Sequence, residues 1–516
     1  MKVRFMKRTR IKSVIILIIL AAFVIYLKFL HDNQANKIIY PQDIQVFEDK
    51  IRIYESRIIP NLGNNGEPAF LDGDDKEKGD NAVKLVALNT VLSDRMPLNR
   101  SLQDNRHKKC KDFTYNPTLK ASVILIFYNE ILSVILRTVW SVILKSPSHL
   151  LKEIILVDDS STAEDVKGIL EHYINTRLSK YDVKLIRLKH RMGLIRARLQ
   201  GARIATGNVM VFLDAHCEAN EGWLEPLLAR IEQERTAVLV PIIDVIEANT
   251  LAYATNGDSF EVGGFSWSGH FTWIKIQDEA KEHLAVKSPT MAGGYHAQES
   301  VTSFGRFHPT FGRYGSITAR LAHVWMDDYK RLFFLYQPAL EHNPVIGDLT
   351  HRKQLRNKLH CKSFKWYLDN VYPEKFIPDE NYFAYGQIRN KYNMCLDDLQ
   401  LSDGKVGPLG LYPCHNFMAM SQLFTLSSKG ELRKEAFCSE ATSNLNVQLT
   451  ECHSHHREQY WLYFSRNKTL YNPSIRKCLS SEGVKDSKGL ILDFCKIIDH
   501  QQWKFTKVNY TAFRET

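Results

Sequence analysis

The sequence lacks the residue spacings of a zinc site, because none of its nine cysteines and 19 histidines forms a CxxC or HxxxH pattern. It also lacks the widespread basic charge of a nucleic-acid-binding protein. Removing six basic residues near the start from the net charge of +11 leaves only +5, mixed with Asp and Glu, so we expect no nucleic-acid partner. Those six, with no acid among them, are Lys2, Arg4, Lys7, Arg8, Arg10 and Lys12.

One long apolar segment follows this basic end and runs from Val14 to Leu30, interrupted only by Lys28. No small-x-small cleavage site comes after it, which favours an uncleaved signal-anchor over a cleaved signal peptide. The positive-inside rule then places residues 1–12 in the cytosol, a transmembrane helix at 13–30 and the remaining chain in the lumen. The short span suits the thin bilayer of the early secretory route. We therefore expect a single-pass type II membrane protein.

Residues 31–81 are polar and mixed in charge, which predicts a lumenal stem that holds the folded part away from the membrane. Three N-glycosylation sequons agree with a lumenal position, and they begin at Asn99, Asn467 and Asn509.

Six of the nine cysteines lie beyond residue 390 and form three successive pairs. In an oxidising lumen a disulfide can close a short loop within each pair: Cys395 with Cys414, Cys438 with Cys452, and Cys478 with Cys495. The pairs belong to a threefold repeat, and each repeat ends in a Q-x-aromatic motif. Small all-β repeats that close in threes predict a β-trefoil, with those aromatic residues in its core rather than on a sugar-binding surface.

Strand-like and helix-like segments alternate from residue 121 onwards. Apolar segments at 122–127, 153–157, 183–188 and 209–213 are typical of strands, with helix-like segments between them. This alternation predicts an α/β fold with a mostly parallel sheet, whose ligands bind at the carboxyl ends of the strands. Asp158 and Asp159 end the second strand, and Asp214 and His216 end the fourth.

Asp214 and His216 form the strongest candidate site. Side chains at positions i and i+2 of a strand point the same way, so the two can share one ion. A carboxylate and an imidazole suit a divalent metal such as Mn²⁺, which would hold a diphosphate and neutralise it as a leaving group. The alternative is an aspartate that caps the next helix and a histidine bonded to the backbone.

Two further residues at the same edge have two interpretations each. Asp159 can accept hydrogen bonds from the ribose or base of a nucleotide, or it can cap the following helix. Arg191 precedes Gly193 at the opening of a helix and can pair with a diphosphate. Alternatively, Arg191 is a solvated surface arginine.

A series of motifs between about residue 84 and residue 508 resembles the polypeptide N-acetylgalactosaminyltransferase family. The resemblance implies a type II Golgi membrane enzyme that moves GalNAc from UDP-GalNAc to Ser or Thr and so starts mucin-type O-glycosylation. The motifs, in chain order, are SDRMPLNRSLQDNRHKKC, SVILIFYNE, EIILVDDSS, HRMGLIRAR, VFLDAHCE, WLEPLLARI, PIIDVI, GGFSW, PTMAGG, ARLAHVWMDDYK and FKWYLDNVYPE.

The resemblance implies a Rossmann-like GT-A glycosyltransferase domain at 82–376 and a ricin-type β-trefoil lectin domain at 383–508. It makes Asp214 and His216 ligands of Mn²⁺ and Asp159 and Arg191 contacts of the donor nucleotide, with the Gly293-Gly294 turn near the donor sugar. In the lectin domain, the second and third repeats lack the binding aspartate and are expected to be structural. The first repeat is expected to bind GalNAc of glycoproteins through Asp397, Tyr412, His415 and Asn416.

The chain departs from the family pattern after PTMAGG. The family continues through a W-G-G-E-N motif to a histidine that completes the metal site, whereas this chain passes almost directly to ARLAHVW. Local alignment puts Thr302 near the place of that third ligand and Thr310 at the place of a tyrosine that contacts the donor. His308 matches a position other than the ligand's, and nothing in the sequence positions His296. Tyr128 also stands where the family has histidine.

Three cysteines remain outside the trefoil pairs. In the family, the partners of the residues matching Cys110 and Cys361 lie inside the missing segment. The two are therefore expected either to pair with each other or to remain thiols. Cys217, within DAHCE, is expected to be an unpaired buried cysteine.

These departures favour a family member that is inactive or strongly impaired as a transferase and keeps its glycan-binding lectin domain. The alternative is an active, Mn²⁺-dependent retaining GalNAc-transferase that holds its metal with two protein ligands, the UDP phosphates and water. A third interpretation is that the segment is missing because of splicing or an error in the gene assignment, and that the full gene encodes a normal enzyme.

Overall fold

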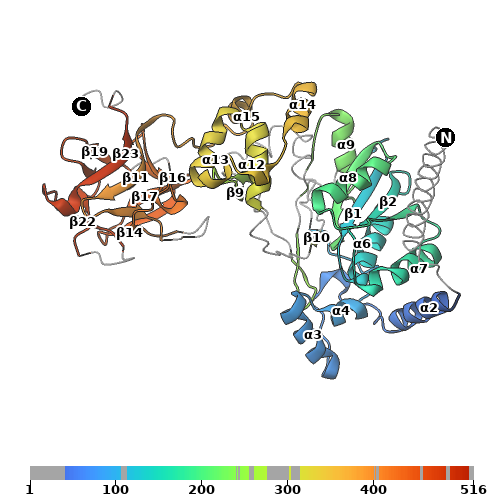
Figure 1. Cartoon of the computed structure of the whole chain (residues 1–516). Coiled ribbons are helices and arrows are strands. Elements are labelled where there is room, and N and C mark those ends of the chain that lie inside the picture. The colour runs from blue at the N-terminus through green and yellow to red at the C-terminus, as the bar shows by residue number, and fades with distance from the viewer. Residues whose placement is uncertain are drawn as a thin grey trace, which may run out of the picture. The chain divides into compact units, whose positions relative to one another are not determined.

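The computed structural model describes residues 41–105, 113–239, 241, 244–254, 261–275, 302–303, 314–399, 401, 406–453, 457–483 and 489–510 (Figure 1). The expected cytosolic tail and transmembrane helix lie outside these residues. So do Cys110, Gly293, Gly294, His296, His308 and Thr310. Within the described ranges, no helix has both the length and the apolar character needed to cross a membrane.

A four-stranded parallel sheet forms the centre of the first part of the chain, as the alternating pattern predicts. The strands run in the order β3-β2-β1-β4. In the register of the sheet, Ile126 of β1 lies opposite Asp214 of β4, and Phe127 lies opposite Asp158 of β2. The two acidic strand ends therefore flank β1. The strands are β1 Ala121–Phe127, β2 Leu151–Asp158, β3 Val183–Arg187 and β4 Val209–Asp214.

Helices cover both faces of this sheet (Figure 1). On one face, Leu125 and Leu156 belong to the same buried cluster as Ile135 of α6. On the other face, Ile124 and Ile155 pack with α8. Gly201 lets α8 approach closely, because a Cβ there would lie 2.4 Å from Ile124. The helices are α6 Leu132–Lys145, α7 Gly168–Arg177, α8 Leu194–Ile204 and α9 Glu225–Gln233.

The expected stem at 31–81 is wrong for the residues that the structure describes. Helix α2 (Pro41–Ser56) packs on α7, and Ile51 is only 1% exposed within the core of the sheet domain. Phe47, Ile51 and Tyr54 recur at helical spacing, so α2 has an apolar face despite its polar composition. The segment continues as α3 Gly73–Val86 and α4 Thr90–Arg95, which also belong to the folded unit.

The chain divides into two compact units, and the second takes residues 260–276 and 308–516. This division differs from the expected limits of 82–376 and 383–508. The reason is Trp267, which is fully buried in one cluster with Phe333 and with Tyr385 of the trefoil. Its backbone N–H donates to Glu435 Oε1 (2.9 Å), and its indole N–H donates to the carbonyl of Phe376 (2.7 Å). The described residues between 314 and 376 therefore share a core with the trefoil.

The second unit contains a hairpin, a group of helices and the trefoil. The hairpin is β8 Glu261–Phe265 with β9 Phe271–Lys275. The helices are α12 Tyr314–Trp325, α13 Lys330–Tyr336, α14 Thr350–Lys358 and α15 Phe364–Asn370. In the first unit, short strands β5 Cys217–Glu218, β6 Val245–Ile246, β7 Tyr253–Ala254 and β10 Thr302–Ser303 form a small second sheet.

The three cysteine pairs form the predicted disulfides, Cys395–Cys414, Cys438–Cys452 and Cys478–Cys495. The aromatic residues of the closing motifs are buried in a shared core, as predicted. The trefoil strands are β11 Tyr382–Asn390, β12 Met394–Asp397, β13 Gly407–Pro408, β14 Gly410–Pro413, β15 Phe424–Ser427, β16 Leu432–Lys434, β17 Phe437–Ala441, β18 Val447–Glu451, β19 Leu462–Phe464, β20 Thr469–Asn472, β21 Lys477–Ser480, β22 Ile491–Asp493 and β23 Trp503–Val508.

The closing glutamines explain how each repeat is fixed. Gln422, Gln459 and Gln501 are fully buried. The side-chain oxygen of each accepts the backbone N–H that follows the second cysteine of its own repeat, at 3.0, 3.1 and 2.7 Å. The same bond therefore recurs three times beside the three disulfides.

Candidate functional site

The carboxyl ends of β1, β2 and β4 bring the expected nucleotide-binding residues to one edge of the sheet. Asp158 is nearly fully buried, where its Oδ1 accepts the Ser161 N–H at 2.7 Å and its Oδ2 accepts a 2.6 Å bond from Arg187. Asp159 is also buried, and its two oxygens accept the backbone N–H groups of Met192 (2.7 Å) and Gly193 (2.9 Å). Asp159 thus fixes the loop that begins α8, rather than capping the helix directly after it.

Arg191 lies on that loop, next to the residues that Asp159 holds. Its guanidinium carbon is 3.6 Å from the centre of the Tyr128 ring, which is a close cation–π contact. Tyr128 is the residue that replaces the family's histidine. Asp159, Arg191 and Tyr128 therefore form one connected group, and the exposed Arg191 has a fixed ring beneath it.

Asp214 and His216 lie at the same edge. The Asp214 side chain is 48% exposed, and Arg198 Nη2 approaches its Oδ1 at 3.5 Å. The His216 side chain is 21% exposed, and its Nδ1 lies 3.1 Å from Glu130 Oε2. We did not single out Glu130 from the sequence, although it stands in the SVILIFYNE motif immediately after β1. The available sequence signal for Glu130 was an acidic residue shortly after the end of a buried strand.

The pairing of His216 with Glu130 fits a metal-binding role. A histidine that donates Nδ1–H to a carboxylate keeps a lone pair on Nε2, and ligating histidines are commonly held in this way. Asp214 supplies an exposed carboxylate as a second donor. Among the described residues, no three His, Cys, Asp or Glu side chains gather in one place as a metal site. The backbone of Thr302 pairs with Glu218, two positions beyond His216.

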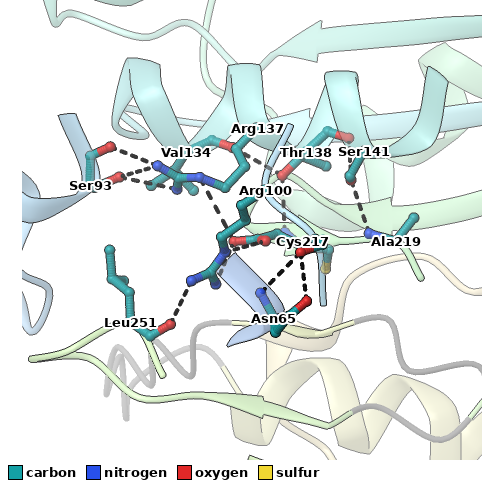
Figure 2. A network of polar contacts seen from close by, with 12 residues as sticks. Asn65, Ser93, Arg100, Val134, Arg137, Thr138, Ser141, Cys217, Ala219 and Leu251 are labelled. Atoms are coloured by element: carbon teal, nitrogen blue, oxygen red, sulfur yellow. Dashed lines mark hydrogen bonds and ion pairs between the residues drawn. The ribbon is translucent and has the colours of Figure 1, made fainter. Parts of the chain in front are cut away.

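His216 lies in the turn between β4 and β5, because β4 ends at Asp214. The strand rule that predicted a common direction for Asp214 and His216 therefore does not apply to this pair. A buried polar network holds the backbone that follows the turn (Figure 2). The Thr138 hydroxyl of α6 donates to the carbonyl of Ala215 and accepts the N–H of Cys217, both at 3.0 Å. It therefore fixes the backbone on both sides of His216. Ser141, one turn further along α6, accepts the N–H of Ala219 at 2.9 Å.

Glu218, the second residue of β5, has a buried carboxylate. Arg100 donates two hydrogen bonds to its carboxylate, at 2.8 and 2.9 Å, and Arg137 lies 3.8 Å away. Arg100 also donates to the carbonyl of Leu251 (Figure 2). Cys217 is a buried free cysteine, as predicted, and burial raises the pKa of its thiol well above the ordinary value. Cys361 is also unpaired and is exposed.

In the first trefoil repeat, a buried glutamine connects Asp397 with the backbone of His415. Asp397 is 3% exposed, and its Oδ2 accepts hydrogen bonds from Ser421 and from the Gln422 side chain, both at 3.0 Å. Its Oδ1 accepts the Leu399 N–H at 2.8 Å. The same Gln422 also accepts the His415 N–H, so one buried glutamine fixes two expected ligands of the sugar.

Three rings follow one another beside this carboxylate. The centroids of Tyr412 and His415 are 5.5 Å apart, and those of His415 and Phe417 are 5.6 Å apart with nearly parallel planes. Tyr412 and Phe417 are 45% and 54% exposed, and Asn416 is exposed between them. Phe417 was not among the expected residues. Its place three residues after Cys414 was the only sequence signal for it.

The second repeat lacks the binding aspartate, as its sequence shows, but it has a glutamate at that position. Glu440 follows Cys438 by two residues, as Asp397 follows Cys395, and it accepts a 3.0 Å bond from Gln459. His453 follows Cys452 and lies 3.4 Å from the same carboxylate. Burial raises the pKa of Glu440, but hydrogen bonds led by the one from Thr450 outweigh it and hold that pKa below the ordinary value. The constellation is present without the aromatic ring of Tyr412, which Thr450 replaces.

The three sequons lie at accessible positions. Asn99 and Asn467 are exposed, and Asn509 is partly exposed. Their glycosylation stays a prediction.

The fold is that of a glycosyltransferase domain followed by a lectin-type β-trefoil. Residues 122–297 match the glycosyl transferase family 2, and residues 384–503 match the ricin-type beta-trefoil lectin domain. The crystal structure of GalNAc-T7 with UDP, GalNAc and Mn²⁺ is similar, with a TM-score of 0.64 and 26% identity over 88% of this chain and 94% of that one.

Curated relatives identify the family more narrowly. The probable N-acetylgalactosaminyltransferase 9 of Caenorhabditis elegans is 37% identical, over 92% of this chain and 94% of the relative. Human polypeptide N-acetylgalactosaminyltransferase 13 is 35% identical, over 88% and 90%. The chain therefore belongs to the polypeptide N-acetylgalactosaminyltransferase family.

Proposed function

We propose that this chain binds GalNAc-bearing glycoproteins through the first repeat of its lectin domain, with a transferase activity that is lost or strongly impaired. The observation that carries the proposal is the set around Asp397. A buried carboxylate, an exposed amide and a row of rings supply the acceptors, donors and apolar surface that a sugar requires. Glu440 makes the second repeat a second candidate subsite of the same kind.

The transferase side of the proposal rests on the metal site. Asp214 and His216 would hold Mn²⁺, which when bound would neutralise the diphosphate of UDP-GalNAc as it leaves. Two protein donors are few for an ion that prefers six ligands, and Arg198 competes for one of them. The absence of a W-G-G-E-N motif from the sequence supports the proposed loss of transferase activity.

The chain's own residues at this edge suit a nucleotide. Asp159 keeps unused lone pairs while it fixes the α8 loop, and Arg191 presents a guanidinium to a diphosphate from its position over Tyr128. We expect UDP-GalNAc to bind weakly. We also propose a Golgi location for the protein, with an anchor at 13–30 and both folded units in the lumen; the three disulfides support an oxidising compartment.

Two measurements on the full chain test the proposal. A GalNAc-bearing peptide should bind to the wild type. Asp397→Ala should remove the binding at the first repeat because Gln422 and Ser421 lose their shared acceptor, so any binding that remains would belong to the second repeat. The matched control is Asp493→Ala, which removes a carboxylate on a strand of the third repeat and should leave binding unchanged. With UDP-GalNAc and Mn²⁺, a Thr-rich peptide should not increase UDP release. A clear peptide-dependent increase would establish the alternative of an active retaining transferase.

A further inference from the structure

The second unit carries a strongly basic surface that plays no part in the sites described above. Residues 349–368 contain six Lys and Arg and no Asp or Glu. They span α14 and most of α15. We name this surface the α14 basic surface, and its cations are Arg352, Lys353, Arg356, Lys358, Lys362 and Lys365.

Most of this charge is not used within the protein. Arg356 pairs with Asp327 at 2.6 Å, and Lys365 pairs with Asp369 at 2.9 Å. The other four cations are exposed, and the structure gives them no ion pair with any carboxylate of the described residues. Helix α14 has no buried residue, so core packing does not require these side chains. A helix that is polar all round is unusual unless its surface has a further role.

A polar hollow lies at the carboxyl end of α14. Its volume is about 470 Å³, and Arg356 and Asn357 form part of its wall together with Asp327, His360, Cys361 and Ser363. The hollow is polar and continuous with the exposed cations. A flexible chain that carries repeated anions can lie along α14 and place one unit in the hollow.

We propose that the α14 basic surface binds a sulfated polysaccharide. The three disulfides indicate an oxidising compartment, where nucleic acid is not a partner and sulfated polysaccharides are the polymers of high negative charge. Sulfate groups accept bidentate bonds from arginine as phosphates do, and closely spaced cations suit their charge density. The described part of this surface is helical and offers no sheet edge for the addition of an extended peptide strand. The inference is independent of the GalNAc subsites.

The test is binding of a heparin oligosaccharide to the full chain in a series of NaCl concentrations. The variant Arg352→Glu/Lys353→Glu should weaken binding at 0.15 M NaCl by about tenfold or more and reduce the salt dependence, because two ionic contacts are lost. The matched control Lys152→Glu/Lys180→Glu makes the same change of net charge at exposed residues of the first unit and should keep wild-type affinity. Glutamine at 352 and 353 should give an intermediate loss without adding acid to the helix.

Several outcomes would overturn the proposal. An equal loss in the control would show attraction by net charge alone. Polyglutamate binding as tightly as heparin would point to an acidic peptide as the partner. If heparin does not bind at 0.15 M NaCl, the α14 basic surface is only a solvated helix surface and the proposal is wrong. Free GalNAc should not compete with heparin, and Asp397→Ala should not change heparin affinity, so failure here is distinct from failure of the lectin proposal.

Discussion

Glu130 is the residue that should most affect metal binding after the two proposed ligands, Asp214 and His216. Glu130 Oε2 lies 3.1 Å from the ring nitrogen that faces away from the expected ion. It therefore sets the tautomer and orientation of the imidazole, while the Thr138 hydroxyl holds the backbone around it.

Replacing Glu130 with alanine should weaken Mn²⁺ binding by about 10- to 100-fold, because outer-shell partners of ligating histidines typically contribute that much. Mn²⁺ electron paramagnetic resonance or calorimetry with UDP present measures this change. The matched control is Glu221→Ala, which removes an exposed glutamate that pairs with Lys145. An unchanged affinity in Glu130→Ala would mean that His216 is not a ligand.

The sequence predicted that some of the candidate site residues meet at one edge and missed others for a physical reason. Asp214 ends β4 and Asp159 directly follows β2, and the parallel-sheet rule brings strand ends together. Glu130 and Phe417 lie outside strands and helices, where the direction of a side chain depends on backbone angles that composition does not determine. Glu440 was set aside because the expected residue was an aspartate, although glutamate provides the same acceptor at the same register.

At the scale of elements, the docking of α2 is the main difference from expectation. Its polar composition predicted a stem. In the structure, however, Glu48 and Glu55 form ion pairs with Arg177 of α7. The hydrogen bonds from Arg177 and then from His172 lower the pKa of Glu48 to about 2. The strands of the sheet were predictable because each contains a short run of mostly apolar residues. The apolar face of α2 instead consists of residues three and four apart in a polar segment.

Acid should loosen α2 before it unfolds the sheet. The pKa of Glu48 is lowered in the folded state, so the stability from its ion pairs is present above the ordinary value of 4.5. That stability is lost as the pH falls from 4.5 through about 2. Hydrogen exchange of the α2 amides should therefore accelerate across this interval. Glu48→Gln should show fast exchange already at pH 7 and a weaker pH dependence, whereas an unchanged profile would assign the docking to Ile51 and Phe47 alone.

At the scale of the whole molecule, covalent crosslinks are distributed unequally. All three disulfides lie in the second unit, each closing a loop of 14 to 19 residues, and the described residues of the first unit contain none. The cysteine pattern predicted the trefoil well. It could not predict that the described residues between 314 and 376 share the trefoil's core, because that depends on Trp267, which is distant in sequence.

A reductant should abolish sugar binding and leave the parallel sheet intact. Each disulfide closing a loop of this length stabilises the fold by about 3 kcal/mol, and Cys395–Cys414 joins the segments that carry Asp397 and His415. Hydrogen exchange before and after treatment should accelerate in residues 382–508 and remain unchanged in β1 and β2. Retained GalNAc-peptide binding after complete reduction would contradict this expectation.

The three interior glutamines connect the stability of the trefoil with recognition. The side-chain oxygen of each accepts a backbone N–H of its own repeat, while the side-chain amides of Gln422 and Gln459 also donate to Asp397 and Glu440. A change at a buried glutamine should therefore disturb folding and sugar specificity together. A change at an exposed ring of one repeat should alter specificity there and leave the other repeats intact.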